Sequence, residues 1–299
     1  MITIEETLVA SAIVTALSTG PYLIYSEVFE GARRPLVWLT LCKEDFSLIG
    51  VAGKAIKFLT ATHLSASSNT EAYVDTSGMG VADKTVARVD LSVGDPIYCA
   101  TQLSDILLED FPNVDWLRLN LRNMGAAVME YLDDSVFDVI NAASGMTHST
   151  TAGLTYGEVV DALAKMENTN WTADEATAPF LLVAPETAAV LLKDTTFVDA
   201  RRYTTYELSR MVEGEIGMFA GCRVLKSVLL DGYDKAFIVF PNDSKNGPVV
   251  ILAWKRRMLV RNERSEFYGH AYYVASIRAN SAVVQSAGIC EITLTTGTP

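Results

Sequence analysis

The most informative stretch of this 299-residue sequence is Phe180-Leu-Leu-Val-Ala-Pro-Glu-Thr-Ala-Ala-Val-Leu-Leu192. Its first four residues are all apolar, which is typical of a strand that is buried on both faces. Pro185 then occupies the favoured first position of a helix, and the negative charge of Glu186 suits the positive end of the helix dipole. The stretch therefore predicts a buried strand at 180–183 that leads directly into a helix at 185–192.

The residues around this stretch predict a compact α/β unit. The apolar positions of 155–167 predict a helix before it, and 237–240 predicts a further strand after it. Between them, Val212-Glu-Gly-Glu-Ile-Gly-Met-Phe-Ala-Gly-Cys-Arg-Val224 contains three closely spaced glycines, which predict a tightly turned segment because glycine tolerates positive φ. Residues 249–260 and 267–294 predict β segments that follow the unit.

The strongest helical signal lies before the unit, over 102–143. Pro112 interrupts the pattern, and apolar residues then recur every three or four positions from about Asn113 onward. The predicted helix at 113–143 is about 45 Å long at 1.5 Å per residue. Residues 144–153 are rich in Ser, Thr and Gly and predict a linker, in which we expect His148 to be solvated rather than catalytic.

The N-terminal third predicts an arm and a long hairpin. Residues 4–18 predict an amphipathic helix, and 22–46 continue as an apolar, mostly extended segment. Residues 54–64 and 84–93 predict two strands, joined by the polar tip 65–80. The pattern alone leaves two readings of the tip open, a floppy surface loop or an arm that reaches a partner.

The chain carries a net charge of −12, and the charge is unevenly distributed. It is −4 over 1–100, −12 over 101–200 and +4 over 201–299. The overall balance argues against a strong nucleic-acid binder, which usually has a basic face. Lys255, Arg256 and Arg257, with Arg261 and Arg264, form a local basic cluster. Because Glu263 and Glu266 interleave with it, ion pairing is favoured over phosphate binding.

The sequence contains few candidates for catalysis. The dinucleotide fingerprint, the phosphate-binding loop and the nucleophile elbow are all absent from it. Asp133 and Asp134 are neighbours on a predicted helix, so they point about 100° apart and cannot share one acid–base site. Four cysteines lie far apart and only three histidines are present, which argues against structural zinc and favours buried free thiols. We expect no enzyme activity, cofactor, metal or membrane segment.

The order of these parts, with the strand–Pro–helix and glycine stretches quoted above, resembles the HK97-fold major capsid proteins of tailed bacterial or archaeal viruses. The resemblance implies an α+β fold. It would make 1–45 an N-arm, 46–99 an E-loop hairpin and 150–249 an A domain. Residues 100–149 and 250–299 would form a P domain, with a spine helix at about 113–143.

The resemblance also implies a function. Such a chain self-assembles through hexameric and pentameric capsomers into an icosahedral shell that encloses double-stranded DNA. Portal, scaffolding or decoration proteins would be further partners, DNA would lie non-specifically at the inner wall, and no membrane would be bound. The virion would be its location, after assembly in the host cytoplasm. The alternative is an encapsulin-type compartment shell that holds a cargo enzyme, while a soluble α+β enzyme would need a catalytic cluster.

We expect contacts between subunits at the hairpin, the acidic helical region and the basic cluster. The hairpin strands are apolar on both faces, and a two-stranded ribbon alone is only marginally stable, so an adjacent subunit is expected to cover it. The acidic region, which includes Asp115, is expected to meet the basic cluster of a neighbour. The candidate contact residues are Lys54, Phe58, Leu59, Val86, Val89, Asp105, Glu109, Asp110, Arg256, Arg257 and Arg261.

Overall fold

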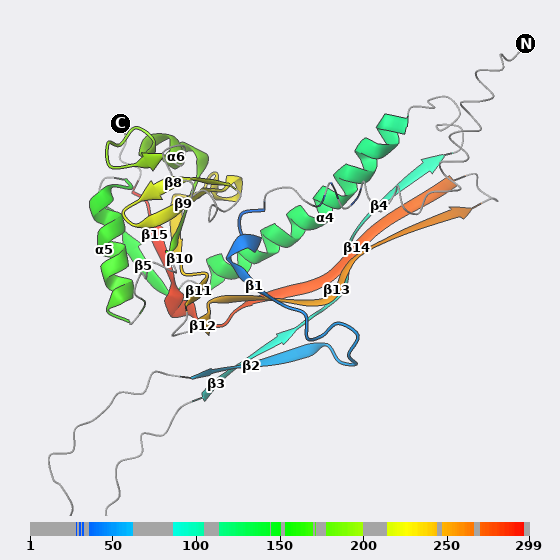
Figure 1. Cartoon of the computed structure of the whole chain (residues 1–299), viewed down its shortest axis with the longest axis horizontal. Coiled ribbons are helices and arrows are strands. Elements are labelled where there is room, and N and C mark those ends of the chain that lie inside the picture. Colours follow the sequence, from blue (N-terminus) through cyan, green and yellow to red (C-terminus); the bar gives the residue numbers. More distant parts are fainter. Residues whose placement is uncertain are drawn as a thin grey trace, which may run out of the picture.

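The structure is a computed structural model (Figure 1). It describes residues 28, 30, 32, 36–61, 86–104, 114–143, 145–150, 153–169, 171, 178–199, 214–243, 247–265 and 270–295. The helix expected at 4–18 and the hairpin tip at 65–80 lie outside these residues.

A seven-stranded sheet forms the α/β unit, and its central strand is the one predicted first. Strand β6 (Phe180–Val183) is buried at all four positions and pairs antiparallel with β10 (Lys235–Val239) and parallel with β9 (Cys222–Lys226). Burial on both faces explains why all four side chains are apolar. The spatial order is β5 (Met146–Ser149), β15 (Ile289–Thr293), β10, β6, β9, β8 (Glu215–Phe219) and β7 (Val198–Asp199).

Two predicted helices of this unit are confirmed. Helix α6 (Pro185–Leu191) begins with its proline in the first turn, directly after β6. Helix α5 (Tyr156–Glu167) begins after Thr155, whose hydroxyl oxygen accepts a hydrogen bond from the Glu158 amide. This cap satisfies one of the free amides at the helix start.

The glycine-punctuated segment is a tight hairpin, as predicted. Phe219 of β8 pairs with Cys222 of β9, so only Ala220 and Gly221 form the turn. Both turn residues have positive φ, 50° and 80°. Positive φ at both central positions is the signature of a type I′ turn, whose twist matches that of paired strands.

A second sheet carries the long helix (Figure 1). Its strand order is β1 (Cys42–Asp45), β13 (Val250–Ser265), β14 (His270–Val283) and β4 (Ile97–Ser104). Strand β1 runs parallel to β13, and the other pairs are antiparallel. Helix α4 (Val114–Ala142) lies along this sheet, and its bounds are within one residue of those predicted at each end.

Helix α4 joins the two larger hydrophobic cores of the described residues. Leu121, Met124, Val128 and Leu132 pack over the second sheet, with Tyr273 among their buried neighbours. The next turns change partners, because Val136, Phe137 and Ile140 belong to the core of the α/β unit. Helix α4 therefore has one continuous apolar face, with apolar residues every three to four positions, and this face packs against both sheets.

The described part of the N-terminal arm lies against α4. A Cβ atom on Gly125 would lie 2.0 Å from the carbonyl oxygen of Val28, so only glycine admits the arm at this point. Val28 is fully buried. The extended conformation expected for 22–46 is wrong in part, because Val28 and Glu30 are helical and η1 (Leu39–Leu41) is a 3-10 turn before β1.

The predicted hairpin is an antiparallel ribbon of β2 (Ala55–Ala61) and β3 (Val86–Ser92). Leu91 of β3 and the adjoining Val93 are buried with Leu48 and Ala253, against which Phe58 also packs. An adjacent subunit is therefore not needed to cover the base of the ribbon, and the expected cover of the rest stays a prediction. At its base the ribbon rests on β13 of its own chain.

The predicted linker at 144–153 is wrong for its central residues. They form β5, which pairs parallel with β15 at the edge of the seven-stranded sheet. Thr and Ser carry little apolar periodicity, so the strand is specified by its pairing with residues far along the chain. The remaining short elements are η3 (Val228–Leu230), η4 (Ser286–Gly288) and the pair β11 (Asn242–Asp243) and β12 (Gly247–Pro248).

Candidate functional site

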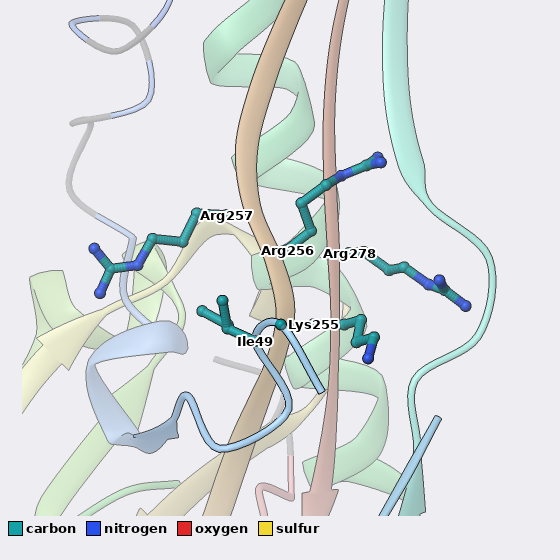
Figure 2. A pocket seen from close by; sticks show the side chains of 6 residues that line it. Ile49, Lys255, Arg256, Arg257 and Arg278 are labelled. Atoms are coloured by element: carbon teal, nitrogen blue, oxygen red, sulfur yellow. The ribbon is translucent and has the colours of Figure 1, made fainter. Parts of the chain in front are cut away.

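The basic cluster lies on an irregular section of β13. The pairing of β13 with β14 shifts register between Trp254 and Arg256 and again between Arg256 and Leu259. Such bulges re-aim side chains that would otherwise alternate regularly. Figure 2 shows the result, since Arg257 extends to one side of β13 while Lys255, Arg256 and Arg278 extend toward the other.

These side chains line an open groove of about 610 Å³ (Figure 2). Four of the six lining residues are cations, Lys255, Arg256, Arg257 and Arg278, and the other two are Ile49 and Gly50. Arg278 lies on β14 and is the direct cross-strand partner of Arg256. The groove therefore combines a cluster that is visible in the sequence with a cation that β-pairing brings to it.

The contacts that fix these cations are to neutral groups. The Lys255 ammonium donates to the carbonyl oxygens of Leu48, at 3.1 Å, and Val51. Nε of Arg278 donates to the Gly94 carbonyl oxygen at 2.8 Å. The segments before β2 and after β3 are thus hydrogen-bonded through their backbone carbonyls to cationic side chains of β13 and β14.

The two remaining cations also contact neutral partners. Nη2 of Arg256 donates to the Ser276 hydroxyl oxygen at 3.0 Å. The Arg257 guanidinium lies over the ring of Phe46, 4.5 Å from its centre, in a cation–π contact. Among the described residues, none of the four groove cations forms an ion pair with a carboxylate.

The interpretation that Glu263 and Glu266 neutralise the cluster is therefore not supported at Glu263. Glu263 lies beyond the bulges, where its cross-strand partner is Tyr272, and Glu266 is outside the described residues. Arg261 is exposed on the same regular section, opposite Val274, and does not line the groove. The side chain of Arg264 is not described.

The other predicted contact residues that the structure describes lie on or next to the ribbon. Lys54 is exposed at the start of the ribbon, while Phe58 and Val89 face each other across its strands and are half-buried. Leu59 and Val86 lie on the ribbon, but their side chains are not described. Outside the described residues lie Asp105, Glu109 and Asp110, and the side chain of Asp115 in the first turn of α4 is not described either.

The sequence reasoning missed an acidic stripe on α4. Glu130, Asp134 and Asp138 are four residues apart in succession, and all three are exposed. Four-residue spacing places side chains on one face of a helix, so these residues share the face that points away from the sheet. The four-residue spacing of these acidic residues within the predicted helix could have revealed the stripe from the sequence.

Asp133 is buried and has a structural role distinct from that of its neighbour. Its carboxylate accepts a hydrogen bond from the Leu39 amide at 2.8 Å and so holds η1 on α4. Burial raises the pKa of Asp133 to about 6, against the opposing effect of the Leu39 and Trp38 amides. Because Asp134 is exposed, the prediction that the two carboxylates cannot share one site agrees with the geometry.

The expectation for His148 is wrong. Its side chain is buried, and its Nε2 lies 2.6 Å from Oε2 of Glu158. His148 lies on β5 and Glu158 in the first turn of α5, so the pair joins this helix to the edge of the sheet. Because the local sequence predicts a linker in place of β5, it gives no sign of this burial.

Burial makes Cys42, Cys222 and Cys290 poor nucleophiles. All four are free, and burial raises the pKa of Cys222 to about 12 and that of Cys290 to about 11. Burial also raises the pKa of Cys42, with help from the negative charges of Asp133 and Glu44. Thiols with such pKa values stay protonated at neutral pH, and the thiolate is the reactive form.

Two other kinds of site have no candidate within the described residues. No three His, Cys, Asp or Glu side chains of the described ranges gather where they could hold a metal ion. In the same part of the chain, no helix is long and apolar enough to cross a membrane.

Comparison with known proteins places the fold. The sequence matches no family model and no curated protein. The structure is similar to the capsid structure of cyanophage P-SCSP1u, with a TM-score of 0.65 and 15% identity over 87% of this chain and 88% of that one. It is also similar to the mature capsid of bacteriophage PhiM1, with a TM-score of 0.61 and 11% identity over 86% of both chains.

A compartment shell gives a comparable match. The SrpI encapsulin complex of Synechococcus elongatus PCC 7942 has a TM-score of 0.56 and 14% identity, with 87% of both chains covered. All three similarities extend over nearly the whole chain. The resemblance inferred from the order of the sequence elements is confirmed: the chain has the α+β fold of the HK97-like phage major capsid proteins.

Proposed function

We propose that the chain is the structural subunit of a closed icosahedral shell that encloses a double-stranded DNA genome. The observation that carries this proposal is the similarity to phage capsid proteins over 87% of this chain and 88% of the other. Coverage on both sides means that the likeness is to a whole capsid subunit and not to a shared small domain. The groove, the buried thiols and the His148–Glu158 pair give no reason to add a reaction to this structural role.

The proposed domain map follows the same likeness. Residues 1–45 serve as an N-arm, 46–99 as an E-loop, 100–149 with 250–299 as a P domain, and 150–249 as an A domain. In this map α4 is the spine of the P domain, and the seven-stranded sheet is the body of the A domain. Strands β5 and β15 fall outside 150–249 although they complete that sheet, so the boundary in space differs from the boundary in sequence.

Copies of the chain are the principal partners in this proposal. They assemble as hexameric and pentameric capsomers, with portal, scaffolding or decoration proteins as further partners and DNA at the inner wall. Assembly takes place in the host cytoplasm, and the product is the virion capsid. The part of the ribbon beyond its covered base lies across a neighbouring subunit.

The second candidate is an encapsulin-type shell that holds a cargo enzyme, and the similarity to the SrpI encapsulin favours it. A capsid needs an inner wall that tolerates DNA, whereas a cargo shell needs a groove for a docking peptide. Both candidates predict closed particles, so particle formation alone does not separate them.

The test is to purify particles from cells that make the chain and to examine their size and contents. Sedimentation and electron microscopy should show closed shells or capsomers. A chain that stays a monomer of about 32.5 kDa at every salt and protein concentration would refute both candidates. Particles made in infected host cells should contain DNA under the first proposal, while a stoichiometric enzyme inside them would favour the second.

A further inference from the structure

The basic groove contains an uncompensated pair of like charges. Arg256 and Arg278 are direct cross-strand partners, and like charges in this position destabilise a sheet. Nε of Arg256 is buried and has no hydrogen-bond partner among the described residues. A pair that destabilises its own strands and faces an open groove is suited to bind an anion from elsewhere.

The acidic stripe on α4 presents the complementary charges. Asp134 and Asp138 are exposed and, within the described residues, form no ion pair. Like charges four residues apart destabilise a helix slightly, so the charges of Asp134 and Asp138 are also uncompensated. Glu130 extends it to eight residues, or about 12 Å along the helix axis.

The spacing of the two surfaces matches. Cβ atoms of direct cross-strand partners are about 5 Å apart, as for Arg256 and Arg278. Cβ atoms four residues apart on a helix are about 5–6 Å apart, as for Asp134 and Asp138. Each guanidinium can therefore face one carboxylate, and arginine is well suited to bind carboxylates with two parallel hydrogen bonds.

The two surfaces do not meet within one chain. The apolar face of α4 is held against β14 and β4 by Leu121, Met124, Val128 and Leu132, which turns the stripe away from that sheet. We propose that the groove around Arg256 and Arg278 of one copy binds the acidic stripe of α4 in an adjacent copy. The contact joins different surfaces of the two copies, and contacts of this kind build rings when the rotation closes.

This inference rests on the proposed self-assembly, and it identifies one contact that holds the copies together. Phosphates of a nucleic acid are the competing occupant of the groove. The acidic stripe favours the contact between copies because it supplies paired carboxylates at the matching spacing. Every copy of the chain carries the stripe, so the concentration of this binding partner rises with the concentration of the chain.

Charge reversal tests the contact. The groove variant Arg256→Glu with Arg278→Glu and the stripe variant Asp134→Lys with Asp138→Lys should each reduce the yield of assembled particles by at least about tenfold, since like charges would then face each other. The chain with all four substitutions should recover most of the yield. The matched control is Asp161→Lys with Glu167→Lys on exposed positions of α5, which changes the net charge by the same amount as the stripe variant and should assemble normally.

Mixing the two failing variants shows whether the contact lies between copies. Each variant offers the charge that the other lacks, so an equimolar mixture should form rings of alternating chains, which close when the number of copies is even. Circular dichroism and thermal unfolding must show that each variant is folded. If the groove variant is unfolded, the milder groove variant Arg256→Gln with Arg278→Gln takes its place, and adding its two substitutions to the stripe variant should restore part of the lost assembly.

Three outcomes would overturn the inference while leaving the proposed function intact. The stripe variant could assemble as the parent chain does, or the four-substitution chain could fail although it is folded. The groove variant could also form normal particles that have lost bound nucleic acid, which would assign the groove to phosphate. Failure of the parent chain to form any particle would instead refute the proposed function.

Discussion

Replacing Asp133 by asparagine should make the stability of the chain less sensitive to pH. The pKa of Asp133 is raised from its ordinary value of 3.8 to about 6, and burial is the largest cause. A raised acid pKa means that the folded state holds its proton more tightly than the unfolded state does. The stability gained from this proton is present below about pH 4 and is lost as the pH rises through about 6.

The magnitude follows from the two pKa values. Their difference corresponds to roughly 3 kcal/mol between the protonated and ionised forms, at 1.36 kcal/mol for each tenfold change in affinity for the proton. The asparagine side chain would keep an oxygen that accepts from the Leu39 amide but would lose capacity for the Trp38 amide, at a cost of about 1 kcal/mol. The variant should therefore be less stable than the parent chain at pH 4 and more stable by about 1–2 kcal/mol at pH 7.5.

The measurement is urea unfolding of the unassembled chain at several pH values between 4 and 7.5. The quantity of interest is the difference in unfolding free energy between the parent chain and Asp133→Asn. Asp161→Asn on the exposed face of α5 serves as the control, because it removes the same charge without affecting a buried group. A difference that stays constant across this pH range would refute the reasoning from burial.

Three further changes test the packing and the ribbon. Trp38→Ala should lower the free energy of unfolding in urea by about 3–5 kcal/mol, because the fully buried indole packs against Phe137 and donates to Ser227. Trp38→Phe should recover most of the lost stability. A loss below about 1 kcal/mol for the alanine variant would contradict the assigned packing. Leu91→Ala should loosen the ribbon base by about 2–3 kcal/mol, seen as faster amide exchange in β3, and unchanged exchange would mean that the small core does not hold the ribbon. Replacing 65–80 by Asn-Gly should leave the subunit folded but impair shell formation or heat resistance, whereas normal assembly and resistance would make the tip a passive loop.

The sequence was most informative where structure depends on neighbours along the chain. The strand at 180–183 is marked by four consecutive apolar residues, the helix after it by Pro185, and α4 by its apolar periodicity. Each of these signals lies within a few consecutive residues, and burial of the apolar side chains then stabilises the element that they predict. The type I′ turn at Ala220-Gly221 belongs to the same class, because positive φ at both positions favours glycine and small residues.

The sequence was less informative where structure depends on distant partners. Strand β5 is built from Met, Thr, His and Ser, and it becomes a strand because β15, far along the chain, offers it an edge. The groove depends on two register shifts in β13, which bring Arg278 opposite Arg256 and turn Arg257 to the other side. No pattern within β13 predicts those shifts. The sequence therefore shows the basic cluster, but it does not show the geometry of the cluster or its lack of carboxylate partners.

The distribution of side chains explains why charge is a sensible basis for the proposed contacts. Most large apolar side chains of the described residues are buried in three cores, and the exposed ones are distributed over several elements, such as Tyr98 on β4, Val190 on α6 and Val228 on η3. Single exposed ion pairs contribute only about 0–1 kcal/mol each, and salt screens them. A shell subunit benefits from such weak contacts, because a misplaced copy can dissociate before the ring closes, whereas each copy in a closed ring is held by contacts on two sides.

Particle assembly should therefore weaken as the salt concentration rises from about 0.1 M to about 1 M, because the Debye length falls from about 10 Å to about 3 Å. The four-substitution chain should show the same salt dependence, because its charges are exchanged and not removed.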